Sequence, residues 1–351
     1  MIIGVDPHKL SHTATAVDPL TNTARASLRI DATLAGYREL LRWGRQFGVR
    51  RWAIENAKGL GCHLAQWLVA RDEVVFDVAT TATSRVRELS RGGRRKNDVI
   101  DASAAASVAA LQGDARPVAA EDHTTLFALL EERRANLAAQ RVRAINQLHA
   151  LMRDLIPGGV RLALTAKIAA TALRTVRPAT PTERTRKDLA WDLVRDIRAL
   201  DTQLVAIAER MTAALEQHDS SLLDVDGIGP VLGVRLIGRT GRAARFPSSD
   251  AFASYAGVAP IEVSSGQRIT HRLSRSGDRQ LNSALHLVAV TQVRMRTSAG
   301  RQFFDRKIAE GKTRNEAMRC LKRRIAAHVW RRMLADEQRQ QLPAAKPAPA
   351  T

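Results

Sequence analysis

A mixed α/β domain, a long helical region and a mainly helical C-terminal domain make up the fold class that the sequence predicts. Short apolar segments alternate with helical patterns over about the first third of the 351-residue chain. Two long stretches then carry apolar residues at three- and four-residue steps, and glycine-rich turns with shorter helical patterns follow them. A chain of this length can hold two or three domains with their own cores.

Several apolar segments in residues 1–115 are predicted to be strands. The first three are joined by short turns, which predicts an antiparallel meander, and the last two alternate with helices, which predicts parallel additions to the same sheet. The predicted strands are Ile2–Asp6, His12–Asp18, Ala24–Ile30, Arg51–Glu55 and Val74–Val78, and the predicted helices are Leu34–Phe47, Leu60–Arg71 and Asp98–Leu111. This element order is typical of the RNase H/RuvC type of nuclease domain, which we expect over residues 1–115.

Two long helices are predicted in the region 120–218. Asp122–Leu155 and Lys187–Gln217 each carry apolar residues at helical spacing, and shorter helices are expected in 161–181 between them. The long helices are expected to pair as an antiparallel coiled coil, within the chain or between chains, or else to form part of a plain helical bundle.

The C-terminal domain is predicted at residues 219–335, ahead of a Pro/Ala-rich tail at 336–351 that we expect to be disordered. The stretch LLDVDGIGPVLGVRLIGRTG at 222–241 places Gly227 and Gly229 before an apolar helix. It resembles a helix-hairpin-helix, whose turn lets backbone N–H groups approach a DNA phosphate. A glycine-rich helix start without a ligand is the alternative. A further helix is predicted at Phe246–Tyr255.

Positive charge is the strongest signal in the composition. The chain has 55 Lys and Arg against 35 Asp and Glu, which gives a net charge of +20. Residues 268–332 alone hold seventeen cations and four acids, so the excess is concentrated, whereas a genomic arginine bias would spread it evenly. This balance predicts a polyanionic partner, most often nucleic acid, bound in a salt-sensitive way.

The sequence carries no signal for a membrane or for secretion. No apolar run approaches the roughly 18 residues that span a bilayer, and the start MIIGVDPHK lacks the features of a signal peptide. Cys62 and Cys320 form no CxxC pair, so we expect neither a disulfide nor a zinc site. We therefore expect no membrane partner and a bacterial cytoplasmic protein associated with the nucleoid.

Four carboxylates are predicted to converge at one edge of the N-terminal sheet. Asp6 and Glu55 end strands that would be neighbours in an RNase H-like sheet, and Asp98 and Asp101 open a helix on one face, about 5–6 Å apart. Carboxylates so close repel one another unless cations neutralise them, and their oxygens suit Mg²⁺ or Mn²⁺, with two ions clamping a phosphodiester. Helix capping is the alternative for Asp98 and Asp101 alone.

A basic cluster directly precedes this helix. It would hold the nucleic-acid backbone beside the metals, or else form a solvated charged surface. Its members are Arg91, Arg94, Arg95 and Lys96.

Several motifs resemble those of the DEDD transposases of the insertion-sequence one-ten family. They are GVDPHK (4–9), AIEN (53–56) and RRKNDVIDA (94–102), followed by DGIGP, YAGVAP and SSG, so the likeness covers about residues 1–335. The resemblance implies a RuvC-like domain joined by a long helical region to a C-terminal transposase domain. It places the family's metal-binding catalytic tetrad on Asp6, Glu55, Asp98 and Asp101.

The resemblance also implies a catalytic serine shortly after an AGLxP-type block, which is Ala256–Pro260 here. Ser265, directly before a glycine, takes this role, with Ser264 as the neighbouring alternative; composition alone would place both in a loop. The Ser265 hydroxyl would attack the phosphate that the metals polarise and form a covalent phosphoserine, which keeps the bond energy for rejoining. The nearby cations that would offset charge on the pentavalent phosphate are Arg268, Arg272, Arg275 and Arg279.

The resemblance further implies three partners. These are DNA of the element ends and of the target, a structured non-coding guide RNA, and further copies of the chain in a homo-oligomer, either a dimer or a tetramer. An insertion-sequence transposase or recombinase is therefore the expected function. A RuvC-like junction nuclease that uses water, and a non-catalytic DNA- or RNA-binding protein, are the alternatives. The long C-terminal region counts against the first alternative, and the four intact carboxylates count against the second.

Overall fold

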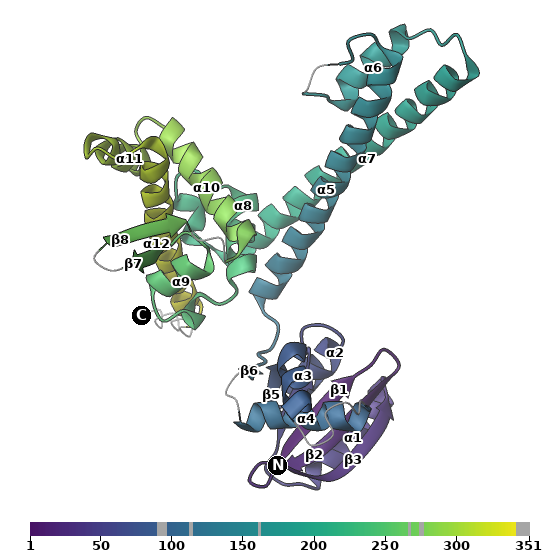
Figure 1. The fold of residues 1–351 in the computed structure, drawn as a ribbon, viewed down its shortest axis with the longest axis vertical. Coiled ribbons are helices and arrows are strands. Elements are labelled where there is room, and N and C mark those ends of the chain that lie inside the picture. The colour runs from purple at the N-terminus through teal and green to yellow at the C-terminus, as the bar shows by residue number, and fades with distance from the viewer. Residues whose placement is uncertain (90–96, 112–114, 161–162, 266–267, 274–276, 342–351) are drawn as a thin grey trace, which may run out of the picture. The chain divides into compact units, whose positions relative to one another are not determined.

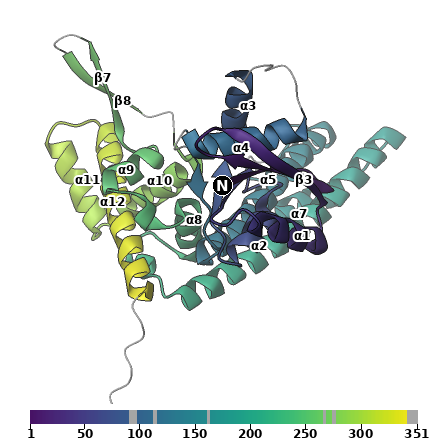
Figure 2. The same cartoon turned by 90° about the horizontal axis from the view of Figure 1, so that it is seen from below.

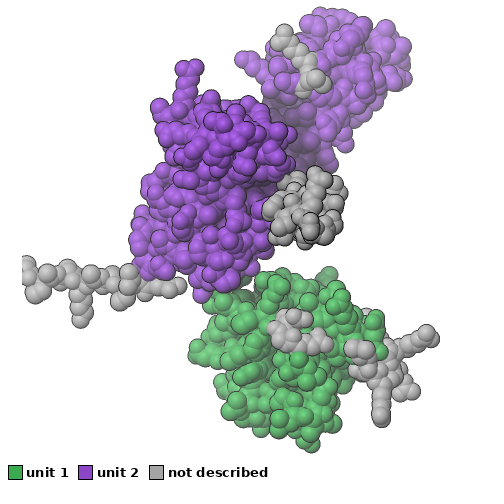
Figure 3. Space-filling view, turned by 60° about the vertical axis from the view of Figure 1, so that its left-hand side comes forward, with its two compact units in different colours: residues 1–121 green, residues 122–351 purple. Residues whose placement is uncertain are grey.

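The computed structural model describes the chain except for residues 90–96, 112–114, 161–162, 266–267, 274–276 and 342–351. It divides into two compact units, Met1–Glu121 and Asp122–Thr351, which Figure 3 shows in different colours. Each unit has hydrophobic cores of its own. Within the described ranges, no helix is long and apolar enough to cross a membrane.

The first unit is built on a six-stranded sheet of order β3-β2-β1-β4-β5-β6. Strands β1 (Ile2–Pro7), β2 (Ser11–Asp18) and β3 (Thr23–Asp31) form the predicted antiparallel meander. Strands β4 (Arg51–Glu55) and β5 (Val75–Val78) continue the sheet in parallel from β1, which confirms the predicted mixed α/β sheet. The short β6 (Arg116–Pro117) pairs antiparallel with β5 and was not predicted, because two residues are too few to show an alternating pattern.

Helices cover both faces of this sheet (Figure 1). Side chains of α1 (Leu34–Arg45) and α2 (Cys62–Val69) share a core with Ile3 of β1, while α4 (Asp98–Leu111) shares a second core with Ile2, whose side chain points to the opposite face. The sequence did not predict α3 (Thr80–Leu89), which packs against α4, because TTATSRVREL lacks a clear apolar stripe.

Helix α4 lies directly on β1 because small residues meet where Gly4 contacts the helix. Ala102 and Ala106 of the helix are fully buried. A Cβ added at Gly4 would lie 1.8 Å from the Ala102 carbonyl oxygen and 2.8 Å from the Ala106 amide nitrogen. Glycine is therefore required at this position for the close approach of the two backbones. The contact fixes where the N-terminus of α4 lies relative to β1.

Two long helices, α5 (His123–Leu155) and α7 (Pro181–His218), run side by side as an arm of the second unit (Figure 1). Arg133 donates a hydrogen bond to Gln203, and Arg186 lies 3.8 Å from Asp154, so later residues of α5 meet earlier residues of α7. The helices are therefore antiparallel, and the pairing is made within the chain.

The arm has a separate core at each end. At the far end, α6 (Ala166–Thr175) packs its Leu173 against Leu148 and Val194 of the long helices. At the near end, Leu215 joins the core of the remaining helices. These helices are α8 (Pro230–Thr240), α9 (Ser249–Tyr255), α10 (Arg279–Arg294), α11 (Ala299–Ala309) and α12 (Arg314–Gln341).

Helix α12 continues to Gln341, past residue 335, where the disordered tail was predicted to begin. Asp336 is 2% exposed and accepts hydrogen bonds from the Ser220 hydroxyl and the Ser221 amide, which anchors this last part of the helix. The predicted tail therefore starts too early, and its remainder, 342–351, lies outside the described residues.

A hairpin of β7 (Pro260–Ser265) and β8 (Arg268–Leu273) extends from the helices around it (Figure 2). The sequence predicted only helices in this domain. The loop expected for Ser264 and Ser265 from composition alone is wrong, because both residues end β7 in register with β8. Alternating β-branched residues such as Ile261 and Val263 are the signal that favours a strand here.

The glycine turn that resembled a helix-hairpin-helix follows a 3₁₀ turn at Ser221–Asp224, where that motif would have its first helix. Gly227 has a φ of +82°, and a Cβ there would lie 3.1 Å from Thr291 Cβ and 3.3 Å from the Val288 carbonyl oxygen of α10. Packing against α10 therefore explains this glycine. Gly229 meets nothing within 4 Å and directly precedes α8.

Candidate metal centre

Asp6 and Glu55 lie on neighbouring parallel strands. Val5 pairs with Ile54 at the end of the β1–β4 ladder, and the two carboxylates belong to the next residue on each strand. The carboxyl ends of parallel neighbours meet at one edge of a sheet, so the structure places both residues at the edge where the sequence predicted them.

Asp98 and Asp101 are the first and fourth residues of α4. The contact of α4 with Gly4 holds this helix across β1, so its first turn lies near the end of that strand. The Asp98 side chain is 42% exposed, whereas Asp101 is buried. A capping role accounts for neither burial nor convergence, since a cap acts from the surface on its own helix.

His8 is a member of this site that the sequence did not predict. Its Nδ1 atom lies 3.7 Å from Asp6 Oδ2, and its Nε2 atom lies 4.0 Å from Asp98 Oδ1. Ligand atoms of Asp6, His8 and Asp98 all lie within 4.8 Å of one another. The only signal in the sequence was the His two residues after Asp6 in GVDPHK, and the turn after β1 brings it back over the carboxylate.

Arg87 of the unpredicted helix α3 forms an ion pair with Asp101. Both side chains are largely shielded, at 21% and 6% exposed. The guanidinium thus neutralises the most buried of the predicted carboxylates when no metal is bound, and it fixes the orientation of that carboxylate.

The pKa of Asp6 reflects both its burial and the other predicted carboxylates. Burial, together with the negative charges of Glu55, Asp101 and Asp98, raises the pKa of Asp6 to about 6, while His8 acts in the opposite direction. A carboxylate cluster that resists its own ionisation binds a cation favourably. Oxygen donors with one imidazole fit a divalent ion such as Mg²⁺ or Mn²⁺. The ligand set indicates the charge of the ion that would bind but not which metal it is.

The remaining predicted site residues lie elsewhere. Ser264 and Ser265 end β7 in the second unit, and Arg268 and Arg272 belong to β8. Arg279 is the first residue of α10 and is exposed. The residues that lie outside the described part of the chain are Arg91, Arg94, Arg95, Lys96 and Arg275.

Comparisons with known proteins point to one family. Residues 3–157 match the family model of the IS110 DEDD transposases, and residues 219–305 match that of the IS116/IS110/IS902 transposase family. The chain is 30% identical to the insertion element IS900 uncharacterized 42 kDa protein of Mycobacterium paratuberculosis, over 80% of this chain and 81% of that protein.

Two further relatives are similar to the chain. The insertion element IS116 uncharacterized 44.8 kDa protein of Streptomyces clavuligerus is 26% identical over 95% of this chain and 94% of its own length. The pilin gene-inverting protein of Moraxella bovis is 33% identical over 37% of this chain and 40% of its own length. On these matches, which extend through both units, the chain belongs to the IS116/IS110/IS902 family of transposases.

Proposed function

We propose that the chain is a transposase that cuts and rejoins DNA at a divalent metal site in a RuvC-like domain of about residues 1–115. The observation that carries the proposal is the meeting of Asp6, His8 and Asp98 at the end of β1, beside Glu55 on the parallel neighbour. Carboxylates gathered at the end of a mixed sheet are suited to phosphodiester chemistry because bound metal ions can bridge them to the phosphate.

Asp6, Glu55, Asp98 and Asp101 are the proposed ligands, and His8 adds a nitrogen donor at the same place. Bound Mg²⁺ or Mn²⁺, as two ions, would polarise the scissile phosphate and stabilise the leaving oxygen. Arg87 pairs with Asp101 and orients it before the metal binds, and would release it afterwards. The imidazole of His8, exposed at the edge of the site, lies where a phosphate would approach.

Ser265 is the proposed nucleophile, with Ser264 as the alternative. Its Oγ–P bond would form while the phosphate's bond to the leaving strand breaks, and the serine proton would pass to the leaving oxygen, so each strand end keeps its atoms for rejoining. The position of both serines at the end of β7, paired with β8, supports this role, because sites built on strands are more precise than sites built on loops.

Four further proposals rest on the family resemblance. The chain would bind a structured guide RNA, assemble into several copies and be located at the bacterial nucleoid. Its transposase domain would be 219–335, joined to the nuclease domain by the helical region 120–218. The gene-inverting relative supports recombination as the shared reaction, since its name describes the inversion of a DNA segment. RNA recovered from the purified protein, sequenced and compared with DNA flanking the gene, tests the guide.

Metal binding tests the carboxylate site. Mn²⁺ titrated calorimetrically into the wild type should bind, and Asp98→Asn and Asp101→Asn should each lose at least about 1.4 kcal/mol of binding free energy, which is tenfold in affinity. Asp18→Asn is the matched control, because Asp18 is a carboxylate of the same sheet paired with Arg25. Equal affinities in all four proteins would exclude the proposed site.

Adduct formation tests the serine. Wild-type protein incubated with DNA of its own element ends and Mg²⁺ should give a protein–DNA adduct that survives denaturation. Ser265→Ala should abolish this adduct and Ser264→Ala should retain it. The reverse result would move the nucleophile by one residue, and an adduct in the double variant would exclude both serines. Cleavage without any adduct in the wild type would instead indicate water as the nucleophile.

A further inference from the structure

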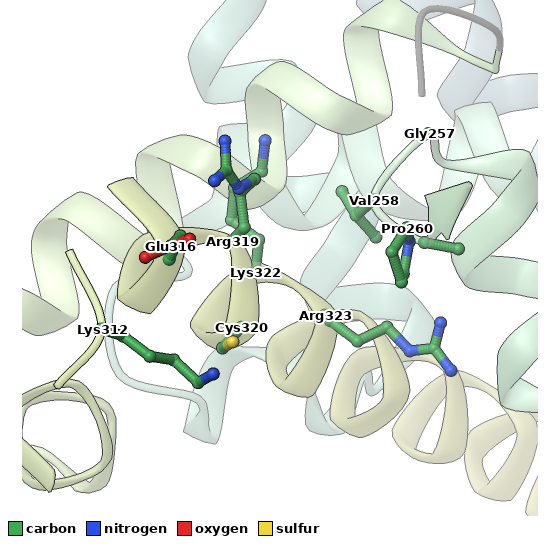
Figure 4. A pocket seen from close by; sticks show the side chains of 10 residues that line it. Gly257, Val258, Pro260, Lys312, Glu316, Arg319, Cys320, Lys322 and Arg323 are labelled. Carbon is green, nitrogen blue, oxygen red and sulfur yellow. The ribbon is translucent and has the colours of Figure 1, made fainter. Parts of the chain in front are cut away.

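A basic cavity of about 520 Å³ lies within the second unit, beside the backbone of Gly257–Pro260 (Figure 4). The opposite wall is formed by the start of α12 and the turn before it. The side chains on that wall are Lys312, Glu316, Arg319, Cys320, Lys322 and Arg323. Four of them are cations and one is an acid, so the cavity has an excess of positive charge.

Of these cations, Lys322 and Arg323 are partly buried, and Lys312 and Arg319 are exposed. The Lys322 ammonium donates a hydrogen bond to Asn282 Oδ1 at 2.5 Å, and the Asn282 amide donates in turn to the Gly257 carbonyl oxygen at 2.8 Å. The ammonium has three N–H donors, and within the described residues one neutral acceptor, Asn282 Oδ1, is recorded for it. Burial lowers the pKa of Lys322, as expected for a cation whose charge is not compensated. An anion in the cavity would supply that compensation.

The other charges leave the cavity free for an anion. The Glu316 carboxylate accepts hydrogen bonds from the Thr313 amide at 2.9 Å and the Thr313 hydroxyl at 2.7 Å, so it is engaged in capping its own helix. Arg323 pairs with Asp250, whose side chain is 74% exposed, and such exposed pairs contribute little free energy. Arg319 is exposed on the same wall. Arg323 can therefore turn to a ligand at small cost.

We propose that this cavity binds a backbone phosphate of a DNA strand. Two ammonium and two guanidinium groups on one wall are donors suited to phosphate. Pro260 lines the cavity and Ser265 ends the same strand, about 16 Å away at 3.3 Å per residue. The bound phosphate is therefore not the one that Ser265 would attack. The cavity would instead hold the DNA strand at a phosphate that flanks the one under attack. The inference rests on the proposed action on DNA but not on the metal site.

Salt dependence of DNA binding tests the cavity. Lys322→Met keeps the aliphatic stem and removes the charge. In EDTA, with mixed-sequence DNA, the slope of log K against log salt should become shallower by about 0.9 for duplex or about 0.7 for single strands, the effect of losing one phosphate contact. Arg331→Gln is the matched control, because Arg331 is exposed on the same helix, about half a turn round the axis, and its slope should equal that of the wild type. The melting temperature of Lys322→Met should not fall, because the variant removes a partly desolvated cation.

Alkylation of Cys320 gives an independent readout, since this thiol lines the cavity between the cations. Saturating DNA should slow its reaction with iodoacetamide severalfold in the wild type but not in Lys322→Met. Cys62, the chain's other cysteine, lies in the first unit and serves as the internal reference.

Several results would overturn the proposal. They are an unchanged salt slope in Lys322→Met, an unprotected Cys320, protection by RNA of the same sequence but not by DNA, and protection by inorganic phosphate without protection by DNA. Because metal is absent, a wild type that binds DNA with the same slope as Lys322→Met refutes the cavity and leaves the transposase proposal intact. A wild type that binds no DNA refutes both.

Discussion

Replacing Gly4 with alanine should disturb the carboxylate site without altering any carboxylate. Ordinary van der Waals contact for the added Cβ begins at 3.4 Å, but the Ala102 carbonyl oxygen lies at 1.8 Å, so the backbones must separate by about 1.6 Å. The obstructing atoms are helix backbone, which cannot rotate away as a side-chain end can. Because α4 carries Asp98 and Asp101, the shift changes their distance from Asp6.

The expected magnitudes follow from this displacement. Overpacking of this kind costs about 1–3 kcal/mol of folding free energy, which thermal unfolding would record as a melting temperature lower by several degrees. A misplacement of about 1 Å in a reacting group can reduce turnover about 100-fold. Calorimetric titration with Mn²⁺ should show an affinity at least about tenfold weaker than that of the wild type.

The control is Val99→Ala on the same helix, where the side chain is 40% exposed, and it should bind Mn²⁺ as the wild type does. The reasoning would be refuted if Gly4→Ala melted early yet bound Mn²⁺ with wild-type affinity. That result would mean that the position of α4 on β1 does not determine the geometry of the site.

Three further substitutions have defined outcomes. Arg87→Ala should lower the melting temperature of the metal-free protein but increase the gain on adding Mn²⁺, because Asp101 loses its competing cation; an unchanged gain would exclude the competition. Arg235→Met should cost about 3–5 kcal/mol in denaturant unfolding because it leaves Glu131, 3% exposed, without its partner, and adding Glu131→Gln should restore part of the loss; full stability of the single variant would contradict this. Burial and the neighbouring His123 lower the pKa of His218 to about 4, below its unfolded value near 6.5, so the unfolded state binds more protons and stability should fall as pH drops from about 6.5 to 4. His218→Gln should flatten that part of the pH–stability curve, and an unaltered curve would assign the dependence to other groups.

The sheet and its carboxylates were predictable because their signals are local. The predicted strands Ile2–Asp6 and Arg51–Glu55 each end on an acid, and the order of strands and helices places those acids side by side. The first turn of α4 was also marked, by two aspartates ahead of a run of small residues.

The parts of the site and of the fold that the sequence did not predict depend on contacts between distant segments of the chain. The place of His8 beside Asp98 and of Arg87 beside Asp101 arises only once α3 and α4 have packed on the sheet. The anchoring of Asp336 by Ser220 is of the same kind, since it joins residues 116 positions apart in the sequence. Charge counts predicted a basic C-terminal domain but could not show that Lys322 is enclosed, because enclosure depends on Asn282 and the Gly257 backbone.

The paired helices α5 and α7 also act as a ruler. At 1.5 Å per residue, the 33 residues of α5 span about 50 Å, the axial length of about 15 base pairs. A separate hydrophobic core packs the helix pair at each end of that length. The arm therefore sets the separation between α6 and the helices around α8.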